Sequence, residues 1–146
     1  MKIYVVGSTA FMHEMVAAKN KLCELGYEGW IHSDYEALVR GEKQEILEGA
    51  AKGEHAAVKR NNDYLRVHYK HICQSDGILV VNLEKNGIKN YIGGNVLIEM
   101  GQAYVNDKKI FLLNDIPQDM PYTPEIECMD PVCLYGEIGA IKGQEK

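Results

Sequence analysis

The 146-residue sequence lacks several features that would define a function at once. Its four cysteines show no C-x-x-C spacing, so we expect buried free thiols in a reducing compartment and no zinc site. No apolar run approaches the roughly 20 residues of a membrane span, and the opening "MKIYVVGSTAF" is too short for a signal peptide. We therefore expect a soluble, cytoplasmic protein.

Basic charge is also scarce. The formal net charge of -5 argues against nucleic acid as a partner, because a phosphate backbone needs a basic stripe. Small anionic ligands remain compatible with the sequence, since a single helix N-terminus can bind them locally. The five histidines do not have the spacing of a metal site. His68 and His71 are three residues apart on one expected helix, but the sequence offers no third ligand for them. We expect neither a metal nor a cofactor.

What is present is typical of one globular domain spanning residues 1–146, with 46% apolar and 25% charged residues. Short apolar, β-branched runs alternate with segments of helical pattern. The expected strands are "KIYVV", "EGWIH", "GILVVN", "KKIFLLN" and "PVCLY". The expected helices cover about residues 12–25, 56–74 and 95–106, with short helices near 124–128 and 137–142.

Alternating strands and helices predict a three-layer α/β fold of the flavodoxin-like or Rossmann-like type. We expect a five-stranded parallel sheet in the order 2-1-3-4-5 with helices on both faces. Residues 33–55 interrupt this alternation with helix formers broken by Gly41, Gly49 and Gly53. We interpret them as an excursion with one or two short helices, which would serve as a lid with Gly41 and Gly53 as hinges.

The order 2-1-3-4-5 predicts where a ligand binds, because its switch point lies between strands 1 and 3. The loops flanking that point are "GSTAF" (7–11) and "NLEKNGIKNYIGGN" (82–95). Asn95 is a suitable N-cap, and Gly93 and Gly94 would let backbone approach a ligand. Glu99 then falls at the edge of the apolar stripe of the following helix. Its position suits either a nucleophile or a solvated side chain that complements the helix dipole.

The segments "KIYVVGS", "QSDGILVVN" and "GGNVLIEMGQAYVNDKKIFLLN" together resemble the nucleoside 2-deoxyribosyltransferase superfamily, which includes the nucleoside 5′-monophosphate N-glycosidases. The resemblance covers about half of the chain. Its most specific part is E-x-G-x-A followed by a Lys-containing turn and a strand, here Glu99, Gly101, Ala103, Lys108 and Lys109.

The resemblance implies that Glu99 is a nucleophile that attacks the anomeric carbon of a (deoxy)ribosyl group and expels the base, as the carboxylate of a retaining glycosidase does. It also implies that the Tyr4 hydroxyl lies near Glu99; a core tyrosine is the alternative. The Gly7, Ser8 and Thr9 turn would offer N–H and hydroxyl groups to a phosphate or a 5′-hydroxyl, or would be an ordinary turn.

One position departs from the family pattern. The family usually has an Asp eight residues before the Asp that opens strand 3, and counting back from Asp76 leads to His68. A histidine can also protonate a leaving base, and its unperturbed pKa suits that task. Asp63 is the substitute if the register differs. Asp76 is either a substrate ligand or a cap, and Asn82 and Asn114 follow strands and should reach sugar or base.

These observations predict cleavage or transfer at the N-glycosidic bond of a nucleoside or nucleotide, in a homodimer or higher homo-oligomer. Base, sugar, phosphate state and the choice between hydrolysis and transfer stay open. A non-catalytic nucleotide-binding or sensor module is the alternative that the replaced Asp favours, and an NAD glycohydrolase is another. A phosphate-loop protein or redox flavodoxin ranks last, because "GSTAF" lacks the Lys of a P-loop and the run of hydroxyl residues expected around a flavin phosphate.

Overall fold

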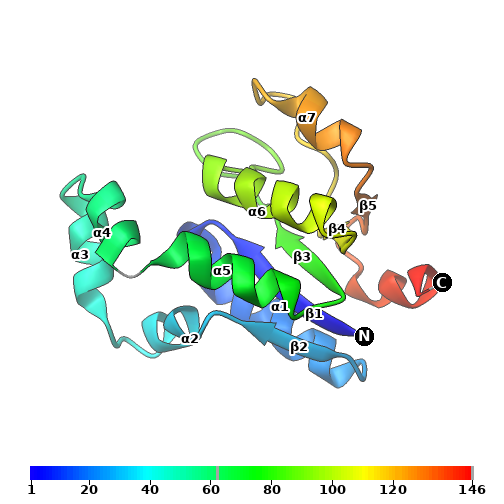
Figure 1. Ribbon diagram of the computed structural model, residues 1–146, viewed down its shortest axis with the longest axis horizontal. Helices are drawn as coiled ribbons and strands as arrows, with labels where there is room; N and C mark the ends of the chain where they lie inside the picture. Colours follow the sequence, from blue (N-terminus) through cyan, green and yellow to red (C-terminus); the bar gives the residue numbers. More distant parts are fainter. Residues whose placement is uncertain (62, 146) are drawn as a thin grey trace.

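The computed structural model describes residues 1–61 and 63–145. Five parallel strands form one sheet in the order β2-β1-β3-β4-β5 (Figure 1), so the predicted α/β class and strand order are confirmed. The strands are β1 (Lys2–Gly7), β2 (Glu28–Ile31), β3 (Gly77–Val81), β4 (Lys109–Leu112) and β5 (Val132–Cys133).

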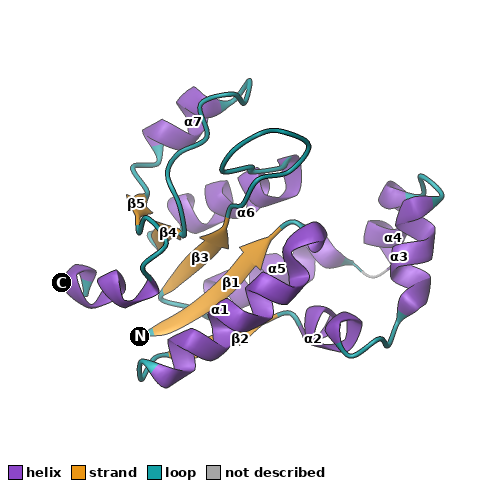
Figure 2. Cartoon of the chain, turned by 180° about the vertical axis from the view of Figure 1, so that it is seen from behind, coloured by secondary structure: helices purple, strands orange, loops and turns teal. Residues whose placement is uncertain are grey.

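Helices cover both faces of this sheet. Helix α1 lies on one face, while α5 and α6 lie side by side on the other (Figures 1 and 2). The helices are α1 (Met12–Glu24), α2 (Ser33–Val39), α3 (Gln44–Ala51), α4 (His55–Asn61), α5 (Tyr64–Cys73), α6 (Gly94–Val105) and α7 (Thr123–Cys128), with 3-10 helices η1 (Thr9–Phe11) and η2 (Ile138–Gln144).

The alternation of side chains along β1 determines which residues reach the α5–α6 face. Ile3 and Val5 pack into the core on the α1 side, whereas Tyr4 and Val6 pack into the core beneath α5 and α6. All four side chains are at most 1% exposed. Tyr4 is therefore directed toward the helices that carry His68 and Glu99.

The prediction of a single helix over residues 56–74 is wrong. Helix α4 ends at Asn61, α5 begins at Tyr64, and Asp63 between them has φ of 50°, in the left-handed region that a continuing helix cannot use. The excursion that begins at residue 33 therefore extends through α4. Figure 1 shows the α3–α4 pair standing at the edge of the molecule beside α5.

Two smaller expectations also need correction. Helix α6 begins at Gly94 with Gly93 as its N-cap, so Asn95 is a first-turn residue and not the cap. All four cysteines are unpaired, as expected, but Cys23 and Cys128 are exposed rather than buried. In the part of the chain that the structure describes, no helix is both long and apolar enough to span a bilayer.

Candidate active site

A cavity of about 540 Å³ lies at the carboxyl ends of β1 and β3, where the strand order predicts a ligand site. Its size suits a small-molecule ligand. The turn after β1, the first turns of α6 and the start of α2 form its wall, and the α3–α4 pair contributes Ile46, Leu47 and His55. The predicted residues that line it are Gly7, Ser8, Thr9, His68, Gly93, Gly94, Asn95 and Glu99.

Gly7 is needed where β1 ends. A Cβ built on Gly7 would lie 2.8 Å from Sδ of Met15 and 3.0 Å from the carbonyl oxygen of Val81. The first distance is shorter than real Cβ contacts and the second is tighter than most of them, so a larger residue would require the Met15 side chain and the end of β3 to shift. The absence of a side chain lets β1 turn directly into the cavity wall.

Glu99 is buried in the wall of this cavity, with 6% of its surface exposed. It belongs to the inward stripe of α6, together with Val96, Met100 and Ala103. A carboxylate in such a stripe is costly unless polar partners surround it. The solvated side chain considered as an alternative is therefore excluded by its burial.

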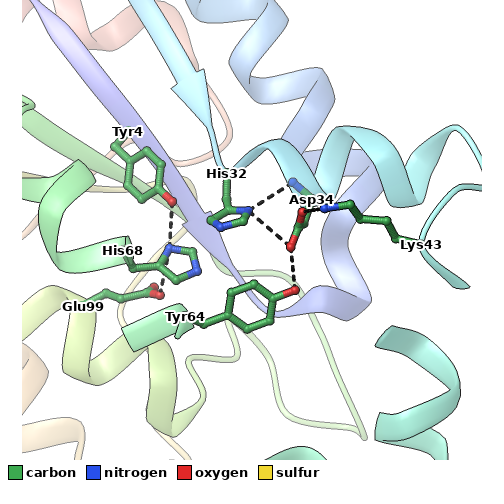
Figure 3. Close-up of polar contacts among 7 residues, drawn as sticks. All are labelled: Tyr4, His32, Asp34, Lys43, Tyr64, His68 and Glu99. Atoms are coloured by element: carbon green, nitrogen blue, oxygen red, sulfur yellow. Dashed lines mark hydrogen bonds and ion pairs between the residues drawn. The ribbon is translucent and has the colours of Figure 1, made fainter. Parts of the chain in front are cut away.

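Polar side chains of β1 and α5 lie close to Glu99. The Tyr4 hydroxyl lies 2.7 Å from Nδ1 of His68, and the same nitrogen lies 3.5 Å from Oε1 of Glu99 (Figure 3). Tyr4, His68 and Glu99 were the three catalytic candidates from the sequence, and the structure brings them together. We name them the Tyr4–His68–Glu99 triad.

Burial lowers the pKa of His68 to about 3, and the neighbouring His32 and His71 add to this effect. His68 is therefore a neutral imidazole at pH 7, unlike the near-neutral titration that its residue type suggests. Burial also raises the pKa of Tyr4, and the charge of Glu99 raises it further, so the hydroxyl keeps its proton. The Tyr4 hydroxyl can donate to Nδ1 of His68, and in that tautomer the ring hydrogen lies on Nε2.

Figure 3 shows the second ring nitrogen of His68 turned toward His32 and Tyr64. Both of these residues also line the cavity. The triad thus combines a buried carboxylate with an N–H donor that is oriented by a protonated tyrosine. Such a pair can stabilise positive charge on one side of a reacting group and negative charge on the other.

Asp34 is a cavity residue that the sequence reading missed. It is 7% exposed, accepts hydrogen bonds from Lys43 and from the Tyr64 hydroxyl at 2.7 Å, and lies 3.8 Å from Nδ1 of His32 (Figure 3). Burial alone would raise its pKa, but the hydrogen bonds of Lys43 and Tyr64 outweigh it and the net pKa is lowered. Asp34 is therefore ionised and joins α2, the turn before α3, and α5.

The position of Asp34 in the chain could have revealed it. It is the third residue after the end of β2, and the carboxyl end of β2 lies at the same sheet edge as that of β1. Lys85 was missed in the same way, although its loop was singled out. Its Nζ lies 3.1 Å from Oγ of Ser8 and faces the Tyr91 ring.

Two predicted carboxylates do not reach the cavity. Asp76 precedes β3, so it lies at the amino end of the sheet, where its carboxylate accepts the backbone N–H of Lys2 at 2.6 Å. Asp63 is exposed at the start of α5 and forms an ion pair of 3.4 Å with Arg66. Asp76 therefore has the structural capping role that was the alternative to substrate binding. Asp63 is not in a position to replace His68.

Asn82 and Asn114 bind each other instead of lining the cavity. Oδ1 of Asn82 accepts the backbone N–H of Asn114 at 2.9 Å, and Nδ2 of Asn114 donates to the Asn82 carbonyl at 3.0 Å. Nδ2 of Asn82 also donates to the carbonyl of Asp115. These bonds fasten the end of β3 to the end of β4, which is a structural role.

Within residues 1–61 and 63–145, no group of three His, Cys, Asp or Glu side chains could hold a metal ion. Comparison of the chain with protein-family models, with curated proteins and with solved structures finds no match. The site therefore has to be interpreted from its own geometry.

Proposed function

We propose that this protein cleaves or transfers at the N-glycosidic bond of a (deoxy)nucleoside or nucleoside 5′-monophosphate, with Glu99 as the nucleophile. The burial of the Glu99 carboxylate in the cavity wall beside Tyr4 and His68 carries this proposal. The resemblance of "GGNVLIEMGQAY" to the nucleoside 2-deoxyribosyltransferase superfamily supports it independently.

In the proposed reaction, a carboxylate oxygen of Glu99 bonds to C1′ while the bond from C1′ to the base nitrogen breaks. The electron pair of that bond passes to the base, which takes up a proton from water as it leaves. The N–H of neutral His68 stabilises the departing base by a hydrogen bond, and Tyr4 keeps the imidazole in the required tautomer. Water or a second base then attacks C1′ and releases Glu99.

One observation supports a non-catalytic nucleotide-binding or sensor module as the second candidate. Because burial lowers the pKa of His68 to about 3, the imidazole cannot act as a charged general acid at neutral pH. A protein that only binds its ligand needs no such acid. The same cavity would then hold a nucleotide without breaking it.

The first experiment is incubation of the protein with deoxynucleosides, nucleoside 5′-monophosphates and NAD, followed by chromatography for free base. Glu99→Gln keeps the shape of the side chain and removes the nucleophile, so it should lower release roughly a thousand-fold or more. Glu125→Gln, an exposed residue of α7, is the matched control. Release that persists in Glu99→Gln contradicts the proposal, and binding without release supports the sensor.

A homodimer or higher homo-oligomer stays a prediction, as does a cytoplasmic location. The outer surfaces of α5 and α6 bear on the first of these. Leu65, Tyr69, Ile98 and Val105 are between 43% and 76% exposed there, and Leu65 and Ile98 also line the cavity. A second copy packed on these helices would bury apolar surface next to the site.

A further inference from the structure

Asp34 belongs to a part of the chain that is fixed to the core. It lies in the first turn of α2, where its backbone N–H donates a 3.1 Å hydrogen bond to Nδ1 of His32. Ala37 and Leu38 of the same helix are buried, and α2 packs against α1. The Asp34 carboxylate is therefore presented from a rigid support.

The two oxygens of this carboxylate bind the two ends of one segment, residues 44–61, which contains α3 and α4. Oδ1 accepts a hydrogen bond from Nζ of Lys43, which precedes α3 (Figure 3). Oδ2 accepts a hydrogen bond of 2.7 Å from the hydroxyl of Tyr64, the first residue of α5. Hydrogen bonds to an ionised carboxylate are stronger than neutral ones. One side chain thus ties both ends of the segment to α2.

The backbone at both ends of the segment has the conformation of a strained hinge. The N–H of Glu42 still bonds back to α2, through the carbonyl of Ala37 at 2.9 Å. Lys43 follows with φ of 53°, and Asp63 at the other end has φ of 50°. The left-handed region is unfavourable for a residue with a side chain. Rotation of either residue to a negative φ relieves that strain and changes the direction of the segment.

Helices α3 and α4 pack on each other and stand at the edge of the molecule (Figure 1). Ile46 and Leu47 of α3 are half-buried and, with His55 of α4, form part of the cavity wall. The side chains of α4 that the structure describes are exposed, namely His55, Ala56, Ala57 and Arg60. A segment with few buried apolar contacts separates from the rest of a protein at low cost. Its departure would open this side of the cavity.

We propose that residues 44–61 form a lid over the cavity that pivots at Lys43 and Asp63, and that Asp34 is the latch that holds the lid closed. Lys43 is half exposed, so water competes for its bond and the latch can open and close. Of the two glycines expected as hinges, Gly41 lies two residues before Lys43, whereas Gly53 lies inside the lid, between α3 and α4. The proposal concerns access to the cavity for any ligand and does not rest on the proposed function.

The test measures how fast a thiol on the inner side of the lid reacts. Leu47→Cys places that thiol on the cavity wall, and maleimide alkylation followed by peptide mass spectrometry gives its rate. Asp34→Asn should raise this rate about 5- to 10-fold, as expected when a half-exposed ion pair and a hydrogen bond are weakened. Asp119→Asn, at an exposed position before α7, makes the same change of charge and should leave the rate unchanged.

Two native cysteines are references within the same sample. Cys128 is exposed on α7 and reports the reagent, whereas Cys73 is half-buried in α5 and reports loosening of the whole domain. Neither rate should change in Asp34→Asn. Equal acceleration at Cys73 and at position 47 overturns the proposal, because the substitution then loosens the fold and not the lid.

Lys43→Gln and Tyr64→Phe each remove one of the two latch bonds and leave Asp34 in place. Each should accelerate alkylation at position 47 by less than Asp34→Asn does. An unchanged rate in all three variants overturns the proposal. Because the labelling uses no substrate, a failure of the base-release experiment leaves this result unaffected, and the two proposals fail separately.

Discussion

Replacing His68 by glutamine should make folding stability less sensitive to acid between pH 7.5 and 5.5. Burial, reinforced by His32 and His71, lowers the pKa of His68 in the folded state to about 3. Since an unfolded histidine has a pKa of about 6.5, the unfolded chain takes up this proton first as the pH falls. Protonation therefore favours unfolding, and the wild type loses stability below about pH 6.5.

The size of the effect follows from the linkage between protonation and folding. Above about pH 6.5 neither state binds the proton at His68, and the contribution is absent. Below it, the free energy of unfolding falls by about 1.4 kcal/mol for each pH unit, until the pH approaches the folded pKa. Between pH 7.5 and 5.5 the wild type should therefore lose about 1.4 kcal/mol that His68→Gln does not lose.

Urea denaturation followed by circular dichroism at both pH values measures this difference. His13→Gln, at an exposed position of α1, is the control and should behave as the wild type does. A lower stability of His68→Gln at both pH values does not affect the comparison, because only the change with pH is used. An equal loss of stability in His68→Gln and wild type would refute the argument that His68 is held neutral by burial.

Two further outcomes follow from the same site. Tyr4→Phe removes the 2.7 Å bond to Nδ1 of His68 and should lower the free energy of unfolding by about 1–3 kcal/mol, which urea denaturation measures. In steady-state kinetics the variant should show a reduced kcat with a smaller change in KM. An unchanged kcat would show that Tyr4 has no part in the mechanism. Asp34→Asn weakens the bonds to Lys43 and Tyr64 and should cost only about 1 kcal/mol, because Lys43 is half exposed. It should also speed tryptic cleavage within residues 44–61, and a cleavage rate equal to that of the wild type would contradict a fastening role for Asp34.

The sheet could be predicted because its strands have a simple signal. A strand buried on both faces is a continuous apolar run, as in "GILVV", and the alternation with helices then fixes a parallel order. The break at Asp63 was missed because the helical pattern on either side outweighed a local signal. Residues 61–63 are Asn-Asn-Asp, which are poor helix formers and adopt the left-handed region more readily than most residues. At the start of α6, Gly93 is the N-cap in place of the better-capping Asn95.

Topology predicted the edge of the sheet where the cavity lies, and the resemblance supplied Tyr4 and His68 as the partners of Glu99. Glu99, His68 and Tyr4 meet because α6, α5 and β1 pack on one face of the sheet. The prediction that Asp76 binds substrate was wrong for a reason visible in the sequence. A residue that precedes a parallel strand lies at the edge of the sheet opposite to the carboxyl ends. Asn82 was placed at the correct edge, but its amide bonds to the neighbouring loop satisfy it there.

The central claim is that Glu99 attacks a sugar carbon. Rapid acid quenching of the protein with its best nucleoside or nucleotide substrate, followed by mass measurement of the intact chain and its peptides, tests it most directly. A glycosyl adduct on the peptide that contains Glu99, absent in Glu99→Gln, is the predicted result. Base release without any adduct, and at the same rate in Glu99→Gln, would contradict the account.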